Sequence, residues 1–323
     1  MRRFKIPNSA TLHNARAFLD CNKSFFAQGQ AKTVLEMDPR WMHTEPFALT
    51  MAAAWGARCR GQGLKVSLKN LTSRAKYAAR MKLFDFLGVD PHFVIQEHEE
   101  AGRFVPIRNI RTPADIRSVI ADVSVLLHLD HDQEALAAVQ YCVSELLRNV
   151  LEHSQSPDGG FVCAHYYSKS GLKRVSIAIA DCGQGIAAHL AATYPDVRGD
   201  DEQALALAML PGITGARPGL YGTSENAGAG LFITRCIAKG SGGYFFLMSG
   251  RAAYRLRRSR TAKILVDPME ENHDLWRVRS NWQGTVVAME IPIDNIADFQ
   301  EYFKSISDQI PRPDRKHRKI QFT

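Results

Sequence analysis

The stretch at residues 139–153 constrains the fold of this chain more than any other. Glu145, Asn149 and His153 recur there at intervals of four residues, a spacing that aligns three polar side chains along one stripe of an α-helix. Apolar residues fill most other positions, so the pattern predicts a largely buried helix. Burying a carboxylate, an amide and an imidazole is costly unless each has a partner. A metal-bound polyanion would supply partners, so the stripe indicates a nucleotide site.

The overall composition is that of an ordinary soluble globular protein. The 323 residues are 45% hydrophobic and 23% charged, and the formal net charge is +8. A chain of this length is typical of two domains. The basic excess concentrates in segments 251–263 and 312–319. A solvated basic face and contact with nucleic acid, an acidic partner or an anionic surface are open interpretations of these segments.

Cysteine usage and the absence of long apolar runs indicate the compartment. The six cysteines are scattered without a CxxC pair, which argues against a zinc site or a disulfide framework and favours buried free thiols. The N-terminus carries basic residues with no apolar segment behind them, so no secretory signal is expected. No apolar run approaches the length of a membrane span. We expect a cytoplasmic protein without membrane contact.

The first hundred residues predict a small α/β domain. Strands are expected at 32–38 and 64–68, and helices at 45–59 and 73–87. This order resembles a STAS-like domain, the fold of anti-sigma-factor antagonists. The resemblance marks Thr44 as a candidate for phosphorylation, whereas the local sequence favours Thr44 as the N-cap of a helix with Pro46 in its first turn.

A polar, acidic segment before residue 103 marks the expected boundary to a second domain. Beyond it, strands are predicted at 104–110, 161–168, 174–180, 243–248, 252–256 and 284–291, and helices at 114–127, 133–153 and 200–210. The strands at 161–168 and 174–180 are expected to pair as a hairpin. The expected division is therefore 1–100, 101–298 and a basic tail at 299–323.

Three further motifs follow the helix stripe. The strand at 174–180 leads into Asp181-Cys-Gly-Gln-Gly-Ile186, where glycines let the backbone approach a flat ligand while the carboxylate accepts a hydrogen bond. Gly228-Ala-Gly230-Leu231 opens an apolar helix, whose N-terminus and glycine N–H groups favour a phosphate. Gly284-Thr285 begins the last strand. Each motif is weak alone, but four in one fixed order are a strong signal.

In this order the motifs resemble those of the GHKL ATPases, the superfamily of gyrase-type topoisomerases, histidine kinases, mismatch-repair ATPases and anti-sigma-factor kinases. The resemblance covers residues 104–293. It implies an α/β sandwich with helices on one face of a mixed, largely antiparallel sheet, and it implies ATP and Mg²⁺ as ligands. The pattern of Asn149 and His153 is nearest the anti-sigma-factor kinase branch.

The resemblance also implies a role for each motif residue. Asn149 would ligate Mg²⁺, while Glu145 would orient the attacking water or act only as a supporting group behind the ligand. His153 would lie near the phosphates or simply cap the helix end. Asp181 would accept a hydrogen bond from the adenine amino group, assisted by Thr285 through water. The other nucleotide contacts that it implies are Gly183, Gly185, Ile186, Gly228, Gly230 and Leu231.

Residues 211–222 are rich in glycine and proline, which predicts a mobile lid over the nucleotide, with Arg217 reaching the γ-phosphate or lying on the surface.

The preferred function is a nucleotide-dependent signalling switch, or a Ser/Thr protein kinase acting on a regulatory protein partner, with homodimerisation left open. The alternative is an ATP-hydrolysing conformational clamp or a lid-gated ATPase without kinase activity, with contact to nucleic acid through the basic segments left open. An autophosphorylating histidine kinase is disfavoured because no phosphoacceptor helix precedes the stripe.

Overall fold

A computed structural model gives the structure of the protein. It describes residues 1–26, 32–40, 42–92, 100–128, 133–168, 173–213, 228–258, 263, 265–293 and 305–306, apart from the side chains at 134, 135 and 138. Within these ranges, no helix combines the length and the apolar character that crossing a bilayer requires.

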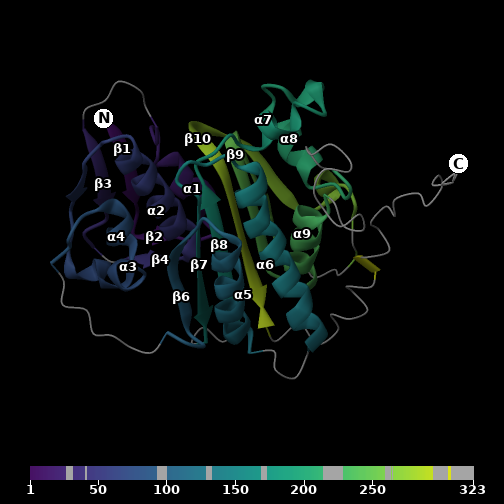
Figure 1. Ribbon diagram of the computed structural model, residues 1–323, viewed down its shortest axis with the longest axis horizontal. Helices are drawn as coiled ribbons and strands as arrows, with labels where there is room; N and C mark the ends of the chain where they lie inside the picture. Colours follow the sequence, from purple (N-terminus) through teal and green to yellow (C-terminus); the bar gives the residue numbers. More distant parts are fainter. Residues whose placement is uncertain are drawn as a thin grey trace, which may run out of the picture.

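A five-stranded sheet forms the centre of the molecule (Figure 1). Its strands lie in the order β6-β7-β8-β10-β9, and every neighbouring pair among them runs antiparallel. The strands are β6 (Phe104–Ile110), β7 (Gly160–Tyr167), β8 (Arg174–Asp181), β9 (Tyr244–Leu256) and β10 (His273–Pro292). The expected hairpin of β7 and β8 is confirmed. The two strands expected at 243–248 and 252–256 are instead one strand, β9, and β10 begins well before the expected residue 284.

Helices cover one face of this sheet and position the polar stripe. They are α5 (Pro113–Leu127), α6 (Gln133–His153) and α9 (Gly230–Gly240), while α7 (Ile186–Leu190), η2 (Pro195–Val197) and α8 (Asp201–Ala208) pack beside β9 at one end. A capping box between Thr112 and Asp115 begins α5. The bounds of α6 are those predicted from the sequence. Val143 and Leu147 turn its apolar side into the core, which leaves the polar stripe on another side.

The N-terminal residues form a second, smaller layer. Its parallel sheet has the order β1-β3-β5, with β1 (Arg2–Ile6), β3 (Thr33–Met37) and β5 (Val66–Lys69), and β2 (Ser9–Ala10) pairs with β4 (His43–Thr44). Its helices are α1 (Ala15–Asp20), α2 (Pro46–Gly61), α3 (Lys76–Arg80) and α4 (Leu83–Leu87), and η1 (Ser73–Ala75) precedes α3. The single helix expected at 73–87 is broken because Lys82 adopts a left-handed conformation with φ +61°.

Helix α2 lies between the two sheets and is buried on all sides. Twelve of its sixteen residues are buried, and it contacts β7 and β8 as well as β1 and β5. Its large Trp55 donates a hydrogen bond to the carbonyl of Phe25 at 2.7 Å. A continuous apolar core therefore joins the N-terminal layer to the second face of the central sheet. The helices of residues 101–298 thus pack on one face of that sheet, and α2 of the N-terminal layer covers the other face.

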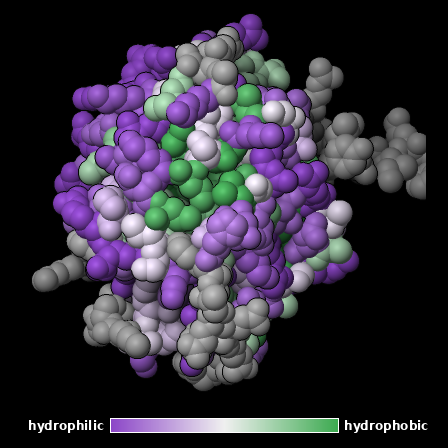
Figure 2. All heavy atoms as spheres, turned by 90° about the vertical axis from the view of Figure 1, so that its left-hand side faces the viewer, coloured by the Kyte–Doolittle hydropathy of each residue, from purple (hydrophilic) through white to green (hydrophobic). Residues whose placement is uncertain are grey.

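The outer face of the N-terminal layer lies on the opposite side of the sheet from α6. Figure 2 shows apolar side chains gathered near the centre of this face, with hydrophilic residues around them. The partly buried apolar side chains at the margin of its core include Leu64, Leu68 and Phe86.

A buried ion-pair network joins the N-terminal layer to the sheet. Arg174 on β8 contacts Glu45 at 3.1 Å and Glu290 on β10 at 2.8 Å, and both carboxylate side chains are at most 4% exposed. Glu45 also accepts a hydrogen bond from the N–H of Leu12 at 2.9 Å. The Arg174 guanidinium therefore pairs with a carboxylate from each layer and links the N-terminal layer to the sheet.

The start of α2 corrects the expectation for Thr44. Glu45, not Thr44, is the N-cap residue, and only Pro46 in the first turn is confirmed. Thr44 lies in β4 with 4% of its surface exposed, and its hydroxyl is buried without a hydrogen-bond partner within the described residues. In this fold the Thr44 hydroxyl is not accessible to a kinase.

Replacing Arg174 with Met tests the ion-pair network. Removal of the guanidinium leaves the buried Glu45 carboxylate without its arginine partner and leaves Glu290 with Arg258 alone. We therefore expect the free energy of unfolding to fall by about 3–5 kcal/mol in urea denaturation. The double variant Glu45→Gln, Arg174→Met should recover part of the loss because it carries one uncompensated charge fewer. A loss for the single variant below about 1 kcal/mol, the range of an exposed pair, would contradict the assigned burial.

Candidate functional site

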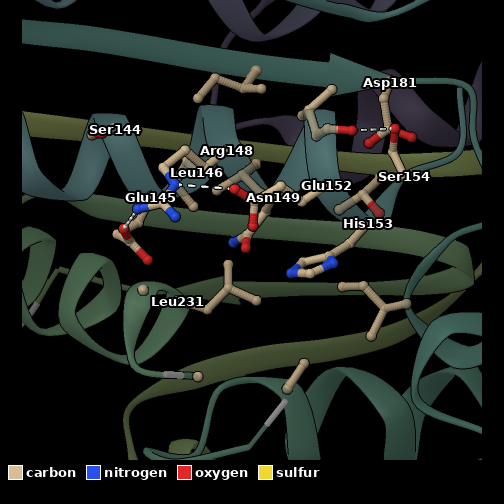
Figure 3. Close-up of a pocket in the computed structure, with 18 of the residues that line it drawn as sticks. Ser144, Glu145, Leu146, Arg148, Asn149, Glu152, His153, Ser154, Asp181 and Leu231 are labelled. Atoms are coloured by element: carbon tan, nitrogen blue, oxygen red, sulfur yellow. Dashed lines mark hydrogen bonds and ion pairs between the residues drawn. The ribbon is translucent and has the colours of Figure 1, made fainter. Parts of the chain in front are cut away.

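A cavity of about 550 Å³ lies over the polar stripe of α6. Figure 3 shows Glu145, Asn149 and His153 along one side of the helix, facing Leu231 of α9, with Asp181 at the far end. Ten of the eleven residues that the sequence predicts for a nucleotide site line this cavity: Glu145, Asn149, His153, Asp181, Gly185, Ile186, Gly228, Gly230, Leu231 and Thr285. Four motifs that are distant in sequence therefore meet at one place.

Gly183 is the exception, because it does not line the cavity. Its N–H donates to the Asp181 carboxylate at 2.8 Å, and an added Cβ would lie 1.9 Å from the carbonyl oxygen of Ser154. The next residue, Gln184, donates from its backbone N–H to that same carbonyl at 2.7 Å. Gly183 is thus needed for the turn after β8 to pack directly on the end of α6.

Asp181 is the most unusual ionisable group of the site. Its residue is 3% exposed, and burial raises the pKa of its carboxyl to about 7, although the backbone N–H groups of Gly183 and Thr285 oppose the rise. The described residues offer its carboxylate no cationic partner. A buried carboxylate without a cationic partner at the edge of a cavity is a marker of a ligand site.

The Gly284-Thr285 motif reaches Asp181 through a close backbone contact. Gly284 has a φ of +109°, and an added Cβ would lie 2.3 Å from the carbonyl oxygen of Asp181. Trp282 fixes the same carbonyl by donating from its indole N–H at 3.0 Å. These contacts bring Thr285 to the cavity beside the Asp181 carboxyl.

Ser249 on β9 is a supporting residue that the sequence did not reveal. Its hydroxyl accepts from the N–H of Ile186 at 2.9 Å and donates to the carbonyl of Gly284 at 2.8 Å. It therefore links the turn after β8 to the start of the Gly284-Thr285 motif. A single serine within a strand carries no recognisable sequence signal for such a role.

At the opposite end of the cavity, an arginine on α6 pairs with two carboxylates of the same helix. Arg148 contacts Glu145 at 3.4 Å and Glu152 at 3.2 Å, as the dashed lines in Figure 3 mark. Burial raises the pKa of Glu145, Arg148 lowers it, and Glu152 adds to the rise. Arg148 and Glu152 were not predicted as part of the site, although they flank the stripe in sequence.

Two histidines stack between these ends. The ring of His153 lies 4.7 Å from that of His189 on α7, measured between centroids, with an angle of 27° between the planes. Burial, followed by the neighbouring His153, lowers the pKa of His189. His189 was not predicted, and its position directly after the Asp181–Ile186 motif is the only available signal.

The expected lid falls mostly outside the described residues. Arg217 and the rest of 214–222 belong to that part, so the lid and the role of Arg217 stay predictions. The described end of this segment contributes Ile213 to the cavity lining, where its carbonyl packs against Gly228.

The donor set of the cavity fits a magnesium ion that arrives with phosphate. Within the described ranges, no three His, Cys, Asp or Glu side chains form a group that could hold a metal. Asn149 contributes an amide oxygen inside the cavity, and the described residues give its side chain no hydrogen-bond partner. Mg²⁺ commonly takes one or two protein oxygens and completes its shell with phosphate oxygens and water. Asn149 is the residue that would hold it.

The sequence matches no family model and no curated protein. The geometry of the cavity and the order of its motifs therefore carry the functional interpretation.

Asp181→Asn should stabilise the protein at alkaline pH. The folded-state pKa of Asp181, about 7, lies above its ordinary value, so stability is greatest at low pH and is lost as the pH rises from about 4 through 7. Above that range the ionised carboxylate costs up to about 4 kcal/mol, which the amide avoids. Urea denaturation should give a higher midpoint for the variant at pH 8 and converging midpoints towards pH 4.

Asp274→Asn is the matched control with the opposite sign. Hydrogen bonds from Arg257 and Arg255, which outweigh burial, lower the pKa of Asp274 to about 2. Its contribution to stability is present above the ordinary pKa of Asp and is lost as the pH falls towards 2. This variant should therefore be less stable than wild type at neutral pH. Equal effects of the two substitutions at pH 8 would contradict the assigned environments.

Proposed function

We propose that this protein binds ATP together with Mg²⁺ in the cavity over α6 and acts as a nucleotide-dependent signalling switch. The observation that carries the proposal is the meeting of the α6 stripe, the Asp181 turn, the start of α9 and Thr285 around one space. Chance resemblance of short motifs would not bring them together in three dimensions.

The adenine would lie at the Asp181 end. The buried carboxylate can accept a hydrogen bond from an exocyclic amino group, and Thr285 offers a hydroxyl next to it. Gly185 and Ile186 border this end with a backbone turn and an apolar side chain, surfaces that suit a flat aromatic ring.

The phosphates would lie between α6 and the start of α9. Helix α9 begins at Gly230, and its N-cap residue, Ala229, has no side chain that could satisfy the first N–H groups. These N–H groups are therefore available to an anion. Asn149 faces the same space, and a Mg²⁺ bound there would neutralise charge on the phosphate oxygens. His153 would supply a further contact along the stripe.

Glu145 would accept a proton at the γ-phosphate. It lies one turn before Asn149, and its raised pKa makes it a better base than an exposed carboxylate. A water or hydroxyl oxygen would form the new bond to the γ-phosphorus while the bond to the leaving ADP breaks. The proton of the attacking group would pass to Glu145.

The position of the N-terminal layer bears on where the phosphate goes. This layer packs against the face of the sheet opposite to the cavity, and Thr44 within it is buried. Transfer to the N-terminal layer of the same chain would have to cross the sheet. The arrangement therefore favours water, or a Ser or Thr of a separate protein, as the acceptor.

The charges of the first basic segment weigh against the alternative clamp. Arg255 and Arg257 pair with Asp274, and Arg258 pairs with Glu290. These guanidinium groups already have acidic partners within the chain, so they are poorly placed to neutralise nucleic-acid phosphates.

Asn149 and Glu145 should separate binding from turnover. Asn149→Ala removes the proposed α6 ligand for Mg²⁺, so calorimetry should show affinity for ATP with Mg²⁺ lowered at least about tenfold. Glu145→Gln should bind ATP within about threefold of wild type but lower turnover about 10²–10⁴-fold. Labelled γ-phosphate should be followed into both water and protein.

Glu270→Gln serves as the control because this exposed carboxylate lies outside the cavity. It should match wild type in binding and turnover. A wild-type protein that neither binds nor turns over ATP would overturn the proposed function.

The affinity for adenosine should depend on pH. Only the ionised Asp181 carboxylate is a full acceptor, so affinity should be greatest above about pH 7 and fall about tenfold for each pH unit below it. Adenosine isolates this effect because it carries no phosphate groups, whose own contacts could change with pH. Calorimetry across the pH range should lose this dependence in Asp181→Asn. Affinity that rises as the pH falls would contradict the placement of the base.

A further inference from the structure

A second cavity of about 570 Å³ lies behind the Gly185 turn. Its walls come from α7, the segment before α8, and the β9–β10 pair. Its lining is dominated by residues with small side chains or none, namely Gly185, Ala187, Ala188, Ala191, Ala192, Gly199, Ser249, Gly250 and Gly284. Small side chains leave room close to the backbone, so this surface can admit an extended chain.

A polar ridge on β10 leads into this cavity. From Trp276 to Gly284, buried and exposed residues alternate strictly, and the exposed set is Arg277, Arg279, Asn281 and Gln283. The last two line the cavity. Alternate side chains on a strand lie about 7 Å apart on one face, which is also the spacing in an extended peptide.

The ridge coincides with an irregularity in the sheet. Between the pairs Arg277–Ala252 and Trp282–Gly250, the four β10 residues 278–281 stand opposite one β9 residue, Arg251. A bulge of this kind bends the strand and redirects its side chains away from regular pairing. The irregular pairing therefore coincides with the exposed side chains of the ridge.

The margin of the cavity carries unmatched positive charge. Arg198 lines it, and exposed Arg251 follows the lining residue Gly250. Within the described residues, Arg198, Arg251 and the two ridge arginines make no ion pair, unlike Arg255, Arg257 and Arg258. The carboxylate that the described lining contains, Asp201, accepts a hydrogen bond from the backbone N–H of Arg251 at 2.8 Å. This charge calls for an acidic partner.

The lining distinguishes between acidic partners. Among the described lining residues, the only aromatic one is Trp282, which is 0% exposed. Single-stranded nucleic acid is usually held by exposed rings on which bases stack. The described lining offers no such ring but does offer a strand face, which favours a peptide.

We propose that this cavity and ridge dock an extended, acidic segment of a partner protein. Acidic side chains at alternate positions would pair with Arg277 and Arg279, and small side chains between them would enter the space over the alanines. Pairing of this type uses the strand face for spacing and the arginines for selectivity.

The position of the cavity would connect docking to the nucleotide. Gly185 lines both cavities, and Ser249 ties the Gly185–Ile186 turn to Gly284. An occupant would therefore contact the same turn that borders the adenine end. This connection rests on the proposed ATP site, whereas the docking site does not.

The test is fluorescence anisotropy with a labelled peptide of alternating Glu and Ser, titrated with the full chain without nucleotide. Arg277→Glu with Arg279→Glu should weaken binding roughly tenfold or more. Ala188→Trp fills the cavity without changing charge and should weaken binding about as strongly. Arg103→Glu with Arg117→Glu makes the same charge change at exposed sites outside the cavity and should leave binding within about threefold of wild type.

Several results would overturn the docking proposal. The proposal fails if the peptide does not bind, or if Ala188→Trp binds it as tightly as wild type. It fails as well if the Arg103 and Arg117 variant loses as much affinity as the Arg277 and Arg279 variant. It also fails if oligothymidylate displaces the labelled peptide at a lower concentration than the unlabelled peptide does. The connection is tested by repeating the titration with saturating ATP. The connection is supported if ATP changes the affinity for the peptide and the peptide changes the affinity for ATP by the same factor. Peptide binding that is unaffected by bound ATP overturns the connection alone. Failure of ATP to bind overturns the proposed function and the connection with it, but leaves the docking site standing.

Discussion

The packing of the turn after β8 on the last turn of α6 is the contact on which the candidate site depends. Gln184 donates from its backbone to the Ser154 carbonyl and from its side chain to the His153 carbonyl, each at 2.7 Å. Gly183 permits this approach because no side chain would fit there. The contact fixes the position of Asp181 relative to the α6 stripe, so the distance between the two ends of the cavity is set by it. Ser249 and Trp282 then hold the third element, Gly284-Thr285, against that pair.

The electrostatics of the cavity are uneven in a way that a polar ligand would correct. At one end, burial raises the pKa of the Asp181 carboxyl. At the other end, burial also raises the pKa of Glu145, which shares its ion-pair partner Arg148 with Glu152. The free protein thus maintains, at a cost in stability, a buried carboxylate that has no cationic partner among the described residues. Groups that are unfavourable in the empty site and favourable with a ligand are typical of functional residues.

The sequence predicted those features that depend on local pattern. Helical periodicity defined α6, strand patterns defined β6, β7 and β8, and motif order brought together ten of the lining residues. Features that depend on distant contacts were missed. Ser249 and His189 acquire their roles only through neighbours far along the chain or across a cavity. The break at Lys82 and the second helical cover of the sheet likewise result from tertiary packing, which overrides local propensity.

Helix α2 belongs to both layers at once. Because it fills the space between the parallel sheet and the back of β7 and β8, neither layer completes its apolar core without it. The N-terminal layer is therefore not tethered like a hinged module that can swing free of the sheet. The layer contacts β9 and β10 as well as β7 and β8, so a change in one layer reaches the other as a small shift of these strands. The sheet is then the transmitting element of the protein as well as its scaffold.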